Sequence, residues 1–431
     1  MAELGVIVLS ESSKAESKPS VIVIVALITA ISLFGDSMLY IALPLYWKEV
    51  GLDSIWQVGV LLSINRFIRL PFNPIVGWIY SRISLKTGLV IAIILGSITT
   101  LGYGILNGFI AWIILRGVWG IAWSFLRIGG LSIVAFNTEE NNRGKSIGLF
   151  NGLYRLGSLV GMLAGGLLVP ILGLSIVSFI FGSLTLLALP LIFLYVKTTP
   201  LKDHEQDNTK KVIFKVNSFI NSLKQGRGRI VFTGFCITLL FQGIFISTLS
   251  SVIEQNHGES VILFGTVISA TFLAGIILSI QWVWGPFLGV RFGTWSDGKK
   301  GRVPVLIISL IFASLTYGFI SNELPILVLI FFTFLVLFAA TSLTTIVDAI
   351  ALDISKNSNV VSFLTTYSMA QDLGASIGPF ISFLIIGLEY GFSYIYWGGS
   401  ILFLFLAILW STSYLKQGKS IAISNVALKK Q

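Results

Sequence analysis

Charged side chains inside long apolar segments are the residues of this sequence that could do chemistry. An ionised group at membrane depth is costly unless it is paired or hydrated, so each one is a candidate for function. Asp36 stands near the middle of the apolar segment 21–47, where its short side chain reaches water at neither end. Burial would favour its protonated form and a nearby arginine its ionised form, so Asp36 could load and release a proton. The other charged residues well inside such segments are Arg66, Arg69, Arg116, Arg127, Arg155 and Asp372.

The elements that must position these charges are membrane-spanning helices. The chain has 431 residues, of which 55% are hydrophobic and 11% charged, too little polar surface for a soluble globule of this size. Its apolar segments lack strict alternation and are long enough to cross a bilayer as helices, so a barrel of strands is excluded. We predict twelve spans, near residues 21–47, 55–80, 87–106, 109–136, 146–169, 174–196, 229–253, 263–291, 303–320, 325–348, 361–387 and 392–415.

The hydrophilic stretch 197–228 divides the chain into two membrane halves. We predict an N-terminal tail (1–20), a first six-helix bundle (21–196), a linker (197–228), a second bundle (229–415) and a C-terminal tail (416–431). Most of the 29 Lys and Arg residues fall in the tails, the linker and the loops on the same side. Because positive loops stay inside, both termini are expected in the cytoplasm, with the chain in the cell membrane. The net charge of +10 therefore reflects topology, and we expect no nucleic-acid partner.

The two halves share motifs at a nearly constant offset, which indicates an internal repeat. A small-residue motif in the fifth span recurs in the eleventh, where Gly374 corresponds to Gly157, and the loop after the second span recurs after the eighth, where Gly293 corresponds to Gly77. Glycines spaced in this way let helices pack closely. The residues of this helix-packing motif are Gly157, Gly161, Gly165 and Gly166, and in the second half Gly374, Gly378 and Pro379.

Four motifs resemble those of the major facilitator superfamily of transporters, and the resemblance covers nearly the whole chain. The loop from Gly77 to Lys86 is similar to the family signature, with Ser81 in place of its Asp, and the loop from Gly293 to Arg302 matches better because it keeps Asp297. The segment 115–120 resembles the buried-arginine motif, and the glycines of the fifth span resemble a motif of antiporters. The resemblance implies an all-α fold of twelve helices in two pseudo-symmetric bundles.

The resemblance also implies where the charges act. Spans one, four, seven and ten line the cavity in this family, so Arg116 or Arg127 would be the partner of Asp36. We expect Asp36 and Arg116 to couple transport to protons; a static ion pair that holds two spans together is the alternative. The residues expected in the substrate cavity are Tyr40, Arg127, Trp119, Trp123, Gln242 and Phe245.

An interdomain gate is expected from charges at matched depth in spans two and eleven, which face each other in the family. We predict an ion pair of Asp372 with Arg69 or Arg66 that forms when the cytoplasmic side closes. Asp297 of the second signature loop is assigned to the same gate. No partner can be chosen for Arg155.

The sequence lacks motifs for other classes of function. It has no complete phosphate-binding loop, no catalytic constellation and no metal-ligand cluster, so we expect no enzyme activity, no cofactor and no metal. The expected function is proton-coupled antiport that exports a small organic or drug-like compound, by a monomer in the lipid bilayer. Uptake or exchange of an organic anion held by arginines is one alternative, and a receptor or scaffold without transport is another.

Overall fold

The computed structural model describes residues 21–138, 143–196, 227–298, 301–355 and 360–428. The predicted N-terminal tail, almost all of the linker and the last three residues lie outside the described residues. Within the described ranges the chain is almost entirely helical. Ten helices are long and apolar enough to cross a membrane, and a bent helix makes the eleventh. The twelfth crossing is a helix with arginines and amides along its length, which lower its hydropathy.

The first half contains six crossings, and each lies within a few residues of its prediction. Glycines with positive φ at Gly51, Gly108 and Gly173 form tight connections near the helix ends. The sixth crossing is interrupted near Ala188, just before a proline. The helices are α1 (Val21–Tyr46), α2 (Trp56–Tyr80), α3 (Leu85–Ile105), α4 (Phe109–Phe136), α5 (Arg143–Leu172), and α6 (Leu174–Leu186) with α7 (Leu189–Tyr195).

The second half repeats this pattern with two irregularities. Its first crossing contains a π-helical segment, η3, between two α-helices, and its second bends by 54° between Gly285 and Phe287. The elements are α10 (Arg227–Thr238), η3 (Leu239–Phe245), α11 (Ile246–His257), α12 (Ala270–Ser296), α13 (Arg302–Tyr317) with η4 (Gly318–Ser321), α14 (Ile326–Ser355), α15 (Val360–Ile386) and α16 (Gly391–Leu428).

Three boundary predictions were wrong. The tenth and twelfth helices end at Ser355 and Leu428 and not near residues 348 and 415, and the eighth span begins at Ala270 and not near residue 263. The residues before it form an antiparallel hairpin of β1 (Ser260–Leu263) and β2 (Thr266–Ser269). Phe264 and Gly265 have positive φ at its turn. β-branched residues favour strands, and they continue the apolar run of the helix, so hydropathy alone could not separate the two.

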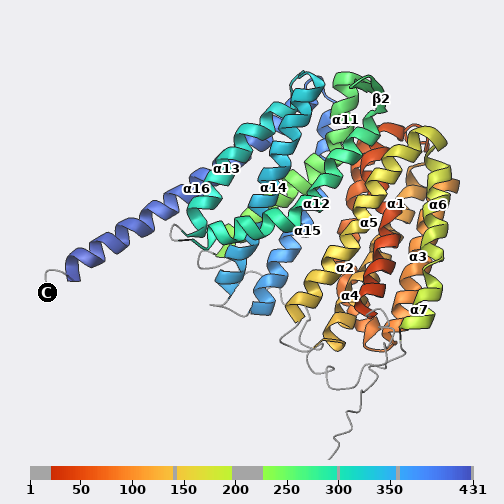
Figure 1. Cartoon of the computed structure of the whole chain (residues 1–431), viewed down its shortest axis with the longest axis horizontal. Helices are drawn as coiled ribbons and strands as arrows, with labels where there is room; N and C mark the ends of the chain where they lie inside the picture. Colours follow the sequence, from red (N-terminus) through yellow and green to blue (C-terminus); the bar gives the residue numbers. More distant parts are fainter. Residues whose placement is uncertain (1–20, 139–142, 197–226, 299–300, 356–359, 429–431) are drawn as a thin grey trace, which may run out of the picture.

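The helices form two bundles (Figure 1), with α1 to α7 on the right and α10 to α16 on the left of the view. The glycine motif brings equivalent helices together in each. A Cβ atom on Gly157 would overlap the backbone of Ala30 in α1, and one on Gly374 would overlap the carbonyl group of Phe235 in α10. The motif therefore packs α5 on α1 and α15 on α10 and η3, as the internal repeat requires.

The bundles meet near the end at which α1 finishes, where α1 contacts α11 and where two further contact regions, which we call seams, join them. The first seam is α2 against α15, and the second is α12 against α5. A Cβ atom on Gly59 would lie 2.6 Å from the carbonyl oxygen of Pro379, and one on Gly275 would lie 2.7 Å from that of Met162. Gly59 and Gly275 hold equivalent positions in the two halves, as do Met162 and Pro379, so the repeat relates the two seams.

We call the end of the molecule at which α1 begins the Val21 end and the opposite end the Tyr46 end. Both glycine contacts of the seams lie in the Tyr46 half of their helices. The hairpin also lies at the Tyr46 end, where it connects α11 to α12 (Figure 1). Nearer the Val21 end, the seam helices carry four charged residues of the candidate site: Arg66, Arg69, Arg155 and Asp372.

Candidate functional site

A buried ion pair between α1 and α4 forms the centre of the first bundle. The NH1 atom of Arg116 lies 2.5 Å from Oδ1 of Asp36. The Asp36 side chain is 8% exposed and the Arg116 side chain is fully buried. Asn65 in α2 donates a second hydrogen bond to the same Oδ1 at 3.2 Å, and the Arg116 Nε donates to the carbonyl oxygen of Leu61 at 2.9 Å. Three helices therefore hold one carboxylate.

Close helix packing places these groups. A Cβ atom on Gly120 would overlap the carbonyl group of Asn65, so only glycine lets α4 approach α2 at this level. Gly35, next to Asp36, packs in the same way on the Thr100 side chain. Among the described residues, both hydrogen bonds to Asp36 reach its Oδ1 and none reaches its Oδ2.

The structure selects between the two arginines expected as partners of Asp36. Arg116 makes the ion pair, whereas Arg127 turns to α5. The NH1 atom of Arg127 donates to Oδ1 of Asn151 at 2.8 Å and to the Tyr154 hydroxyl at 3.2 Å. The Tyr154 ring makes an edge contact with Trp123 at 5.7 Å between centroids. Arg127 thus connects α4 to α5 inside the first bundle.

Two further arginines, Arg66 and Arg69, lie one turn apart on α2 and are half-buried. The Nε of Arg66 donates to the Tyr40 hydroxyl at 3.3 Å, and its guanidinium lies 5.7 Å from the Tyr40 ring centroid. The Arg69 guanidinium lies 5.1 Å from the ring centroid of Trp123. The Nε of Arg69 is buried without a hydrogen-bond partner in the described part of the chain.

The residues expected to form the gate are not joined across the seam in this conformation. No ion pair connects Asp372 to Arg66 or Arg69 among the described residues, although Asp372 lies on α15, which packs on α2. Because the predicted pair belongs to a closed Val21 end, it stays a prediction.

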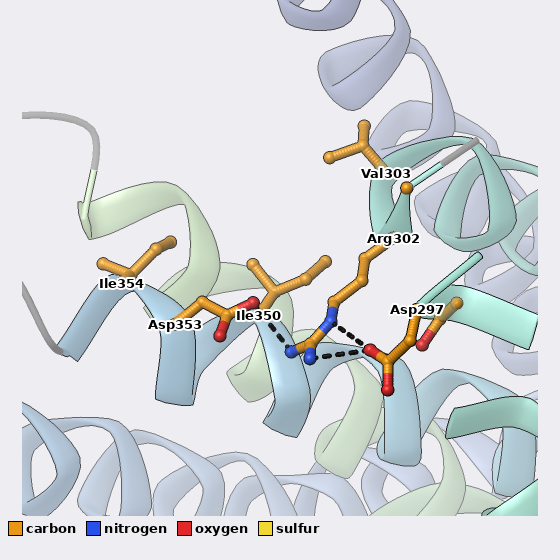
Figure 2. A pocket seen from close by; sticks show the side chains of 8 residues that line it. Asp297, Arg302, Val303, Ile350, Asp353 and Ile354 are labelled. Carbon is orange, nitrogen blue, oxygen red and sulfur yellow. Dashed lines mark hydrogen bonds and ion pairs between the residues drawn. The ribbon is translucent and has the colours of Figure 1, made fainter. Parts of the chain in front are cut away.

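In this conformation Asp297 forms its ion pair within the second bundle, and its assignment to the interdomain gate stays a prediction. Its Oδ1 lies 2.8 Å from an Arg302 guanidinium nitrogen, and the other terminal nitrogen lies 2.8 Å from Asp353 (Figure 2). Arg302 also donates to the carbonyl oxygen of Ala349 at 2.5 Å. These groups line a cavity of about 400 Å³ and attach the α12–α13 loop to α14 within the second bundle.

The residues expected in the substrate cavity differ in exposure. Trp119 and Phe245 are each 1% exposed, and they pack in the cores of their bundles, Trp119 beside Gly96 and Phe245 beside Tyr317. In this conformation they cannot contact a solute. Their role here is the ordinary one of aromatic side chains that fill the spaces between helices. Gln242, in contrast, is exposed on η3.

Two contacts that involve the second bundle were not recognised from the sequence. Asp348 accepts hydrogen bonds from the Tyr367 hydroxyl at 2.6 Å and from Gln371 Nε2 at 3.2 Å. Arg155, for which no partner was predicted, lies with its guanidinium 5.6 Å from the Trp282 ring centroid across the second seam. The repeat was a usable signal, because Trp282 holds the position in the second half that Arg66 holds in the first. Within the described ranges, no group of three metal-ligating side chains occurs.

Similarity to known proteins agrees with this architecture. A family model described as the Major Facilitator Superfamily matches residues 25–298. The chain is 27% identical over 278 residues to the multidrug resistance protein MdtG of Salmonella arizonae, covering 63% of this chain and 65% of that protein. It is 25% identical over 389 residues to MdtG of Escherichia coli, covering 89% and 91% of the two chains.

Solved structures show the same fold. A bacterial homolog of the human lysosomal transporter Spinster, in an inward-facing and unoccupied conformation, has a TM-score of 0.72 at 15% identity and covers 93% of this chain and 98% of its own. A POT family transporter in complex with a thioalcohol-conjugated peptide has a TM-score of 0.69 at 13% identity, with coverage of 92% and 96%. The chain belongs to the major facilitator superfamily and is a multi-pass membrane transporter of small molecules, not an enzyme.

Proposed function

We propose that this protein exports small organic compounds by proton-coupled antiport. The observation that carries the proposal is the buried ion pair of Asp36 and Arg116, with Asn65 as its third member. Relatives that match most of the chain are named multidrug resistance proteins, which supports export of drug-like compounds. Burying two charges is costly, so the buried pair indicates a function that needs it. A scaffold without transport offers no such function.

The mechanism follows from the charge of Asp36. When Asp36 is ionised, Arg116 holds it and α1 is attached to α4. A proton on Oδ2 neutralises the carboxyl group, weakens its attraction for Arg116 and leaves the buried guanidinium to seek another acceptor. The two protonation states thus favour different arrangements of the helices, and a proton gradient can drive the cycle.

The remaining features of the proposal concern topology. The predicted linker and tails lie on the side that carries most of the Lys and Arg residues, which favours a cytoplasmic Val21 end in the cell membrane. We propose residues 21–196 and 229–415 as the two moving bundles and the monomer as the transporting unit. The ion pair of Asp372 with Arg66 or Arg69 would form as the Val21 end closes.

Proteoliposomes test the role of Asp36. Liposomes that contain the purified protein are loaded in turn with three fluorescent solutes: anionic carboxyfluorescein, neutral Nile red and cationic ethidium. We expect a pH gradient to drive movement of at least one of them in the wild type, and Asp36→Asn to abolish this drive while exchange at equal pH persists. The matched control is Glu389→Gln, an exposed acid in a loop, which should change neither reaction.

Two outcomes would contradict the proposal. Gradient-driven transport that survives Asp36→Asn would leave the pair a static tie between helices. Absence of flux for every solute in the wild type, with the protein folded, would favour the scaffold alternative.

A further inference from the structure

The geometry points to Arg66 and Arg69 as a binding site for the acidic group of the substrate, which makes small organic anions the preferred solutes. The acidic group is a carboxylate, phosphonate or sulfonate. This inference rests on the proposed transport function for its biological meaning, but binding can be measured without transport. Neither arginine is assigned to substrate binding by the sequence motifs.

The two guanidinium groups are placed to act together. Positions three apart on a helix point to the same side, and both side chains are half-buried, so that they are partly desolvated but still accessible. Tyr40 and Trp123 flank them through contacts of 5.7 and 5.1 Å between guanidinium and ring. Trp123 is half-buried and offers apolar surface for the body of an organic solute next to the charges, whereas Tyr40 is buried and holds Arg66 in place.

The local charge is not balanced by the protein. Three guanidinium groups, of Arg66, Arg69 and Arg116, lie near two carboxylates. Asp36 is occupied by Arg116 and Asn65, and Asp372 makes no ion pair with the described residues. Arg66 and Arg69 therefore repel each other without a carboxylate in contact, and an anion between them would remove this repulsion.

The hydrogen-bonding capacity of the pair is also unfilled. Arg69 donates no hydrogen bond to the described residues, and its Nε is buried. Arg66 donates only through Nε, to Tyr40. A guanidinium presents a planar fork of donors that matches the two oxygens of an acidic group. The same donors would disfavour an organic cation.

Asp372 gives the site a second role in the cycle. Asp372 lies on α15, which packs on α2 in the first seam, so its carboxylate can replace the substrate as the anion of the pair. Asp372 would occupy the arginines when the empty transporter closes, and the substrate would exclude it when bound. Asp372→Asn should therefore strengthen anion binding rather than weaken it.

Binding to the detergent-purified full chain tests the inference. Thermal stabilisation is titrated with benzoate, phenylphosphonate, benzamide and benzylamine, which share one ring and differ in charge. We expect the two anions to stabilise the wild type and the amide and amine to do so at least about tenfold less potently. Arg66→Ala and Arg69→Ala should each weaken anion binding by about tenfold or more, while Arg291→Ala, at an exposed arginine of α12, should not.

Further variants separate loss of folding from loss of binding. Arg66→Lys and Arg69→Lys keep the charge but lose the fork, so they should bind phenylphosphonate with intermediate affinity. Asp36→Asn should retain anion binding, which distinguishes failure of this site from failure of proton coupling. Equal potency of benzamide and benzoate, or anion binding that survives both alanine substitutions, would overturn the inference.

Discussion

The two seams between the bundles are equivalent in backbone and different in chemistry. Each brings a glycine of one bundle against a carbonyl group of the other, Gly59 with Pro379 and Gly275 with Met162. Further along, at positions related by the repeat, the first seam has Arg66 and Asp372 on its two helices, and the second has Trp282 under Arg155. In both seams the cation belongs to the first bundle.

This difference distinguishes the backbone contacts, which hold the bundles together, from the side chains, which differ between the seams. Both seams keep the close backbone contact, which holds the two bundles together. The second seam pairs its cation with a neutral ring, an attraction that needs no counter-charge. Among the described residues, Arg66 and Arg69 of the first seam have no carboxylate in contact, and these are the arginines that we propose to bind an anion.

The largest expected effect comes from filling the glycine contacts. Gly59→Leu and Gly275→Leu each force a side chain into the backbone of the other bundle, and each should lower the free energy of unfolding by about 1–3 kcal/mol. Thermal unfolding of purified protein measures the effect. The matched controls are Gly77→Leu and Gly293→Leu, which follow in the same two helices and have open space beside them. Seam variants that are as stable as these controls would contradict the equivalence of the seams.

A smaller effect is expected from the cation and ring of the second seam. Trp282→Ala and Arg155→Ala remove a contact worth about 0.5–2 kcal/mol. Measured as a double-mutant cycle of unfolding free energies, the coupling energy should be favourable, and Trp282→Phe should retain part of it. Coupling that is absent in this cycle would mean that the two seams do not differ as described.

The smallest effect is expected in the loops that follow the seam helices. Asp297 pairs with Arg302 in the second half, whereas the hydroxyl of the equivalent Ser81 donates to the nearby Trp78 carbonyl oxygen. Asp297→Ser makes the loops alike and should lower the unfolding free energy by roughly 0–1 kcal/mol, because the pair is partly exposed. Unfolding at low and high salt measures this, since screening should reduce the difference. A large loss that is insensitive to salt would assign the loop a greater role.

The sequence predicted the features that depend on length, apolarity and repetition. Most helices begin and end within a few residues of the predicted spans because a bilayer fixes their length, and the offset between Gly157 and Gly374 identified the repeat. The exceptions are the start of α12 and the ends of α14 and α16. The hairpin at 260–269 was not predicted because its Val and Ile residues are as apolar as the helix that follows. Asp36 could be recognised as a candidate, but its choice of Arg116 over Arg127 depended on the close approach of α4 and α2 at Gly120.

Features that depend on packing between distant helices could not be predicted in this way. Trp119 and Phe245 have the composition expected of a cavity, yet rotation of their helices turns them into the cores. Arg155 had no evident partner because Trp282 lies on the other bundle. Asp297 was expected at the gate from its loop motif. The motif does not specify which residue the carboxylate contacts, and in this conformation that residue is Arg302.

The β1–β2 hairpin limits how the second bundle can move. Its strands pair from Ser260 with Ser269 to Leu263 with Thr266, and the backbone of Ala270 donates to that of Glu259. This short ladder leaves no slack between the last turn of α11 and the first turn of α12. α11 packs on α1 and α12 packs on α5. Because the hairpin joins α11 to α12, we expect a tilt of α11 against α1 to move α12 against α5 as well.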